Sequence, residues 1–174
     1  MSKDEQYQQA LGRIQALIAH ETDVIAVMAT VACELHQALD HFDWTGFYRV
    51  VEPGVLKIGP YQGGHGCLVI SFDRGICGRC AREQKTQLAP DVTRDAAHIA
   101  CSSSTRSEIV VPVLDAASRV RALLDVDSDA PNAFDPVDAQ YLEEVCRWVG
   151  ALYEAGSGTA WEAGDPIPPV VGSP

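Results

Sequence analysis

The stretch WTGFYRVVEPGVLKIG, residues 44–59, decides the fold class of this chain. Its first half is aromatic and β-branched, Pro53 and Gly54 follow, and a second apolar run begins at Val55. Two such runs separated by two turn-forming residues are typical of a β-hairpin. The sequence therefore predicts that a sheet begins here.

Two helices are expected before the hairpin. Apolar residues recur at helical spacing over residues 5–20, and again from Val24 to Leu39. Thr22 or Asp23, between the two patterns, is typical of a helix N-cap. Neither pattern carries residues that indicate chemistry, so we expect both helices to pack against a sheet.

Further strands are expected after the hairpin. A strand is expected over residues 67–72, and the runs SEIVVPVL (107–114) and RVRALLDVDS (119–128) predict two more that are joined by a short turn. Residues 87–106 have the composition of a long loop. A last helical pattern begins at Pro136, a residue favoured at the first helical position.

This order of elements predicts an α+β fold, with one antiparallel sheet of five or six strands flanked by N- and C-terminal helices. A length of 174 residues suits one domain, which we place at residues 1–155. Residues 156–174 are rich in Gly, Pro and Ser, and this composition predicts a disordered C-terminal tail.

Composition argues against several classes of partner. Asp and Glu number 24 against 13 Lys and Arg, so the formal net charge is −11. Nucleic acids and anionic membranes both require a basic surface, so neither is expected as a partner. The chain has no apolar run long enough to span a membrane, and its first residues lack the apolar core of a signal peptide. We therefore expect a cytoplasmic protein.

Six cysteines in a reducing compartment indicate redox catalysis or metal binding more than structural disulfides. Cys33 and Cys146 lie within helical patterns, and Cys80 follows in a short helix. Free cysteines are among the most buried residues, so we expect these three in the core.

The other three cysteines, Cys67, Cys77 and Cys101, lie in or beside loops. Cys77 stands at the start of a predicted helix, and Cys101 has His98 and Arg106 nearby in sequence. A helix N-terminus or a nearby cation lowers the pKa of a thiol. From the residues alone, each of these three cysteines could equally be a reactive thiol or a buried core residue.

Cys77 and Cys80 form a C-x-x-C pair, which has two further interpretations. One is a thioredoxin-like redox pair, although no βαβ pattern surrounds it. The other is a zinc site completed by Cys67 and Cys101, although no second metal-binding pair of the usual spacing follows.

Three acidic residues are candidates for one cluster. Asp125 and Asp127 are two apart in a predicted strand, so they share a face, and Glu108 opens another strand. If those strands are neighbours, the carboxylates converge, raise one another's pKa and provide a general acid or a site for an ammonium group. The alternative is a solvated edge of the sheet.

Several motifs, in this order, resemble the free methionine-(R)-sulfoxide reductases, which are GAF-domain enzymes. They are WTGFY, GPYQG with the loop that ends at Cys67, GICG, KTQLAPDV, HIAC, SEIVVPV and LLDVDS, spread over residues 44–142. The resemblance implies a GAF fold with a ligand pocket closed by loops. It also implies free methionine-R-sulfoxide as substrate, thioredoxin as reductant and no cofactor or metal. The apolar faces of the terminal helices are compatible with a homodimer.

The resemblance also implies roles for single residues. Cys101 matches the catalytic cysteine, Cys67 the main resolving cysteine, and Cys77 a third cysteine near the substrate. The matching pocket residues are Glu108, Asp125, Asp127, Trp44 and Tyr48. The chain departs from the family pattern at Gly66, where alanine is usual, and at Ser102, where aspartate is common.

A non-catalytic GAF domain that senses a small ligand or a redox state is the alternative function. Such a module has no need of three cysteines able to meet one another. Turnover that depends on Cys101 distinguishes the enzyme from the sensor.

Overall fold

The predicted hairpin is present in the computed structural model, which describes residues 1–95 and 103–155. Cys101, His98 and the predicted tail lie outside the described residues. The elements are α1 (Lys3–Ile18), α2 (Val24–Ala38), β1 (Trp44–Glu52), β2 (Val55–Gln62), β3 (Val69–Ser71), α3 (Gly75–Glu83), β4 (Gln87–Ala89), the 3₁₀ turn η1 (Val92–Arg94), β5 (Ser107–Leu114), β6 (Val120–Ser128) and α4 (Pro136–Ala155). Gly54 makes the hairpin turn with a φ of 78°, which glycine adopts at no steric cost.

The strands of the described residues form one antiparallel sheet in the order β3-β2-β1-β6-β5-β4. The two central strands, β1 and β6, come from opposite halves of the chain, with Trp44 opposite Asp127. The predicted α+β class and antiparallel sheet are confirmed. One expectation was incomplete: residues 87–106 contain the strand β4, which at three residues is too short to show a periodic pattern.

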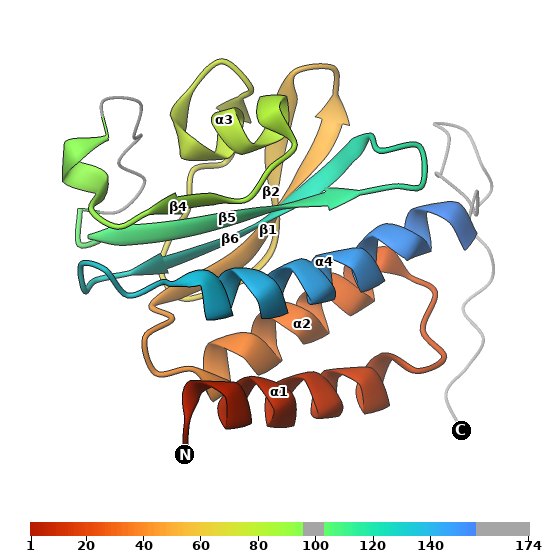
Figure 1. Ribbon diagram of the computed structural model, residues 1–174. Helices are drawn as coiled ribbons and strands as arrows, with labels where there is room; N and C mark the ends of the chain where they lie inside the picture. The colour runs from red at the N-terminus through yellow and green to blue at the C-terminus, as the bar shows by residue number, and fades with distance from the viewer. Residues whose placement is uncertain (96–102, 156–174) are drawn as a thin grey trace.

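Helices α2 and α4 cover one face of the sheet, α1 packs against these two helices, and α3 lies on the other face (Figure 1). Alternate strand residues such as Phe47, Ile109 and Leu124 enter the core beneath the three long helices. Their neighbours, including Tyr48 and Leu123, face α3 and form a second, smaller cluster. The face beneath α3 is the one that carries the candidate site.

Side chains fix where the helices begin. Asp23 accepts hydrogen bonds from the backbone N–H groups of Ile25 and Ala26, which confirms one of the two predicted N-caps. Asp135 accepts a hydrogen bond from the N–H of Val137 at 2.7 Å, at the start of α4. Such caps satisfy backbone donors that have no partner inside the helix.

Two of the three cysteines expected in the core are there. Cys80 and Cys146 are buried, and their thiols point to the carbonyl oxygens of Val110 and Val111. Cys33 is only partly buried and accepts a hydrogen bond from Gln37 one turn later. It lies off the apolar stripe of α2, which explains why that expectation was wrong.

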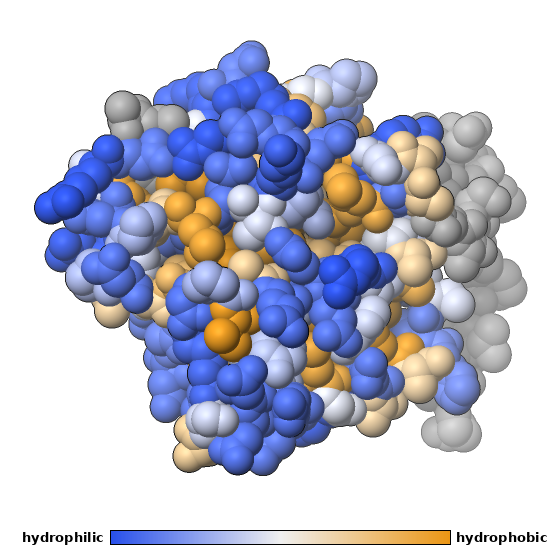
Figure 2. Space-filling view, viewed as in Figure 1, coloured by the Kyte–Doolittle hydropathy of each residue, from blue (hydrophilic) through white to orange (hydrophobic). Residues whose placement is uncertain are grey.

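The face of the molecule drawn in Figure 2 is mostly hydrophilic, in keeping with the net charge of −11. Figure 2 shows small apolar areas among polar residues on the face that Figure 1 presents. Among the described residues, none of the helices combines the length and the apolar character that a membrane crossing requires.

Asp138, buried in the first turn of α4, joins the two ends of the domain. It accepts hydrogen bonds from Lys3 at 2.6 Å and from the Tyr7 hydroxyl at 2.7 Å, and lies 3.3 Å from His41. Burial alone would raise the pKa of Asp138, but the hydrogen bonds from His41, Lys3 and Tyr7 lower it from 3.8 to about 2.

We expect this network to make stability depend on pH. The folded pKa of Asp138 lies below the unfolded value, so the ionised carboxylate stabilises the fold fully above about pH 5, by about 2 kcal/mol. That contribution is lost as the pH falls through 3.8 towards 2. Urea unfolding of the wild type and Asp138→Asn from pH 7 to pH 3 measures it as the difference between the two proteins.

The difference in the free energy of unfolding between the wild type and Asp138→Asn is expected to shrink towards low pH. The exposed Asp40 provides the control, because Asp40→Asn removes a carboxylate that belongs to no such network. A wild-type advantage over Asp138→Asn that stays constant from pH 7 to pH 3 contradicts the prediction.

Candidate active site

The site is built on three adjacent strands, β1, β6 and β5. Trp44, Asp127 and Glu108 are register partners across them, and Gly46 and Asp125 are the next pair on the same face, two positions along. Register partners point to the same face of a sheet. The strands that carry the three acids are therefore neighbours, as the predicted cluster requires.

A buried thiol meets two of these acids. The sulfur of Cys77, from α3, lies 4.0 Å from Oε1 of Glu108. Cys77, Glu108 and Asp125 each offer an atom within 4.8 Å of the others, and all three residues are buried. Oδ1 of Asp125 is also buried and accepts no hydrogen bond from the described part of the chain. The cluster therefore has an acceptor left over for a ligand.

The electrostatics of the cluster favour protonated carboxyl groups. Burial, followed by the charges of Glu108 and Asp127, raises the pKa of Asp125 well above its usual range. Burial and the charge of Glu108 do the same to the pKa of Asp127, with smaller effects from Asp129 and Asp43. Buried like charges in contact disfavour joint ionisation, so a proton stays in the cluster near neutral pH.

The structure corrects one expectation about Cys77. Its position near the start of a helix predicted a lowered thiol pKa, but its side chain is only 4% exposed. Burial, then the charges of Asp125 and Glu108, raise the pKa of the Cys77 thiol well above its usual value. The helix turns this side chain inward onto the acids, so Cys77 is a neutral thiol here.

Aromatic rings form a wall beside the acids. The ring of Trp44 stacks on Tyr48 at 5.9 Å and on Tyr61 at 5.5 Å between centroids, and its indole N–H donates to the Gly64 carbonyl. Sequence reasoning missed Tyr61, although the GPYQG motif contains it. Flat apolar surfaces of this kind suit a thioether or methyl group of a ligand.

Gly66 explains how this wall fits the loop that precedes Cys67. A Cβ at this position would lie 3.0 Å from Trp44, from Ile58 and from the Tyr48 hydroxyl. The alanine that is usual in the resembling family would need these neighbours to shift by a few tenths of an ångström. Glycine here allows the loop to approach the aromatic rings closely.

A cavity of about 500 Å³ opens at the ends of the same strands. Its lining residues are Asp43, Trp44, Gly64, His65, Ser103, Ser104, Thr105, Asp127 and Asp129. Asp43, another residue that sequence reasoning missed, accepts hydrogen bonds from the N–H of Asp129 at 2.7 Å and from the Ser128 hydroxyl at 3.2 Å. The mouth of the site is therefore acidic and held to the end of β6.

The state of the cysteines differs across the site. Cys67, half-buried after the glycine-rich loop, is disulfide-bonded. Among the described residues, the free thiols are those of Cys33, Cys77, Cys80 and Cys146. The alternative zinc site made from four cysteines is not favoured, because Cys67 is oxidised and the Cys80 thiol points to the Val110 carbonyl.

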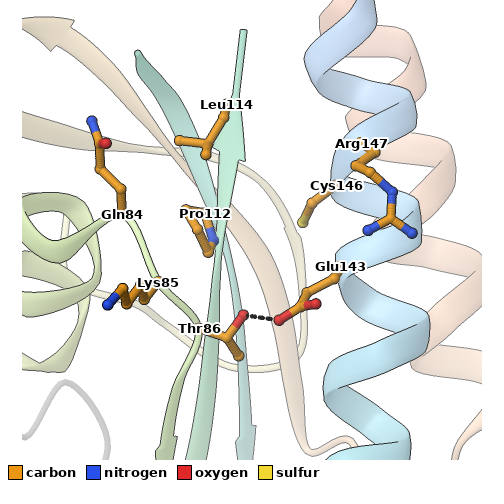
Figure 3. A pocket seen from close by; sticks show the side chains of 8 residues that line it. All are labelled: Gln84, Lys85, Thr86, Pro112, Leu114, Glu143, Cys146 and Arg147. Carbon is orange, nitrogen blue, oxygen red and sulfur yellow. Dashed lines mark hydrogen bonds between the residues drawn. The ribbon is translucent and has the colours of Figure 1, made fainter. Parts of the chain in front are cut away.

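A second cavity, of about 440 Å³, lies between α4 and the segment that links α3 to β4 (Figure 3). The Thr86 hydroxyl donates to Glu143 across it, and Lys85 and Arg147 flank it. Its one sulfur belongs to Cys146, and burial raises the pKa of that thiol. This cavity contains none of the predicted site residues and has no activated nucleophile.

Comparison with known proteins places the chain in a family. The family model described as the GAF domain matches residues 21–152. The "GAF domain-containing protein A" of Dictyostelium discoideum is 40% identical over 146 residues, which cover 84% of this chain and 91% of that protein. The chain therefore belongs to the GAF-domain family.

Similarity to one group within that family is equally clear. The free methionine-R-sulfoxide reductase of Escherichia coli is 34% identical over 145 residues, which cover 83% of this chain and 87% of that protein. The X-ray structure of the free methionine-R-sulfoxide reductase from Neisseria meningitidis, in complex with its substrate, superimposes with a TM-score of 0.82 and 38% identity. That match covers 89% of this chain and 93% of the other. The resemblance stated from the motifs is confirmed.

Proposed function

We propose that this protein reduces free methionine-R-sulfoxide to methionine, with Cys101 as the nucleophile. The observation that carries the proposal is the buried cluster of Cys77, Glu108 and Asp125 beneath the aromatic wall, in a chain related to enzymes of that name. The acids would hold the substrate's ammonium group. The rings of Trp44 and Tyr48 would contact its methyl group.

In the proposed reaction, the Cys101 thiolate attacks the sulfoxide sulfur. A carboxyl group of the cluster protonates the sulfoxide oxygen, which then passes to Cys101 as a sulfenic acid while methionine leaves. The cysteine sulfur is oxidised by two electrons and the methionine sulfur is reduced by two. The raised pKa of Asp125, caused first by its burial and then by the charge of Glu108, supports a carboxyl group as the donor.

Cys67 would resolve the sulfenic acid. Its thiol condenses with the oxidised Cys101 to form a disulfide, and one water molecule leaves. Thioredoxin then restores both thiols by thiol–disulfide exchange, and its own dithiol becomes a disulfide. The oxidised state and half-buried position of Cys67 support this role, since a resolving sulfur must be reached by a protein reductant.

Cys77 would have a different part. As a buried, neutral thiol facing Glu108 and Asp125, it is suited to orient the acids and unsuited to attack the substrate. For Cys77 to take part in disulfide exchange as well, α3 would have to turn this buried side chain outward.

The test is NADPH oxidation coupled through thioredoxin and thioredoxin reductase. The substrates are free methionine-R-sulfoxide, the free S epimer and a sulfoxide within a blocked peptide. We expect turnover of the free R epimer alone. If folded, reduced protein turns over none of the three substrates, the proposal that it is an enzyme is contradicted, and the alternative of a non-catalytic sensor is favoured.

A further inference from the structure

The buried cluster in the site has the donor set of a metal centre. It offers one thiol sulfur and two carboxylate oxygens, from Cys77, Glu108 and Asp125, within 4.8 Å of one another. Asp125 is only 6% exposed, yet its Oδ1 accepts no hydrogen bond from the described residues. An acceptor that is buried and left without a donor costs free energy, and a cation removes that cost.

The chemistry of the donors selects the ion. Thiolate together with carboxylate suits Zn²⁺, whereas Mg²⁺ and Ca²⁺ prefer oxygen ligands alone. A tetrahedral zinc ion, with bonds of about 2.3 Å to sulfur and about 2.0 Å to oxygen, places those two atoms roughly 3.5 Å apart. The sulfur of Cys77 and Oε1 of Glu108 are 4.0 Å apart, so a small inward shift of two side chains brings them to ligand geometry.

We propose that Zn²⁺ binds reversibly to Cys77, Glu108 and Asp125 and excludes the substrate from the site. The second half of this proposal rests on the proposed function, because it takes these acids as the substrate's partners. The first half concerns the cluster alone.

The surroundings favour entry of a cation. The cavity of about 500 Å³ leads to Asp127, the cross-strand neighbour of Glu108, and Asp43 and Asp129 stand at its mouth. A cleft lined by charges of one sign concentrates ions of the other sign. Metal ligands bind in their deprotonated form, so zinc would displace any protons that the thiol and the carboxyl groups carry, and its charge would offset their mutual repulsion.

Bound zinc would stop the reaction for two reasons. Glu108 and Asp125 would be committed to the metal, so neither could hold the ammonium group or give a proton to the sulfoxide oxygen. Inhibition should therefore be competitive with methionine sulfoxide and reversed by a chelator.

Cobalt(II) is the probe for the site itself, because thiolate ligation gives a near-ultraviolet charge-transfer band and tetrahedral geometry gives visible bands. The protein carries Cys33→Ser, Cys67→Ser and Cys101→Ser, so that the two partly buried cysteines and the proposed nucleophile are absent. We expect both sets of bands on titration with Co²⁺, and their loss on addition of Zn²⁺.

Two variants in this background form a matched pair. Cys77→Ala should abolish the charge-transfer band, whereas Cys80→Ala, one turn later on the same helix and outside the cluster, should keep it. Asp125→Asn should weaken Co²⁺ binding by at least about tenfold. A band that survives Cys77→Ala, or no band with millimolar Co²⁺ in protein shown by circular dichroism to be folded, overturns the proposed site.

The competition is tested on pre-reduced wild type in a single turnover, without thiol reductants that bind zinc. Zn²⁺ should raise the substrate concentration needed for half-maximal rate and leave the maximal rate unchanged, and equal Mg²⁺ should do neither. If the cobalt spectrum is as expected but zinc has no effect on a working reductase, the proposed competition is wrong and the proposed metal site stands. If the wild type makes no methionine at all, the proposed function fails, and the cobalt spectrum still decides the metal site.

Discussion

Replacing Cys101 with serine is expected to lower methionine formation by about 10⁴-fold or more. A serine hydroxyl is not ionised near neutral pH, so it cannot supply the anion that attacks the sulfoxide sulfur. The acids and aromatic rings remain, so substrate binding should survive. The measurements are methionine formed in a single turnover, by chromatography, and substrate affinity by calorimetry.

Two further cysteine variants give this prediction its controls. In the presence of thioredoxin, Cys67→Ser should form about one methionine per protein molecule and then stop, because the sulfenic acid on Cys101 has no thiol to condense with. Cys33→Ser should behave as the wild type, since Cys33 lies on α2 in contact with Gln37. Wild-type turnover by Cys101→Ser, in the presence of normal substrate affinity, would exclude Cys101 as the nucleophile.

Replacing Gly150 with alanine is expected to destabilise the fold by about 3 kcal/mol. A Cβ at this buried position of α4 would lie 2.2 Å from the carbonyl oxygen of Leu114 in β5. Backbone atoms of a strand cannot yield as a flexible side chain can, so helix and sheet must move apart. For a chain of this length the loss corresponds to a Tm about 10 °C lower, which calorimetry can measure.

The matched control is the same substitution in another helix. Gly12 lies exposed in α1, and a Cβ there would meet nothing within 4 Å. Gly12→Ala should stabilise the protein by up to about 1 kcal/mol, because alanine favours the helix and restricts the unfolded chain. Changes of the same sign in both variants would contradict the idea that contact with Leu114 decides the effect.

Local patterns predicted most of the fold. The hairpin at Pro53 and Gly54 and the N-cap at Asp23 each depend on residues close in sequence, and these were predicted. The strand at Gln87–Ala89 was missed because three residues carry no period. The contact of Gly150 with Leu114 could not be predicted, because it exists only once α4 packs on β5.

The cluster of acids was predicted only in part, because local patterns do not give the order of the strands in the sheet. Alternation along one strand placed Asp125 and Asp127 on one face, but only the sheet order brings Glu108 beside them. Helix position alone suggested an ionised Cys77, whereas the structure turns that thiol onto buried acids. Residue type and spacing therefore placed the two aspartates on one face, and tertiary packing raises the pKa values of Cys77 and Asp125.

The central place of β1 and β6 has a consequence for biosynthesis. Trp44 pairs with Asp127, so the ladder that carries the site closes a loop of about eighty residues. Closing so long a loop costs chain entropy before any contact compensates for it, and topologies of this kind fold slowly for their size. On the ribosome, the first hairpin would emerge early and wait with one edge unpaired. The ligand pocket would appear only after β6 has left the exit tunnel.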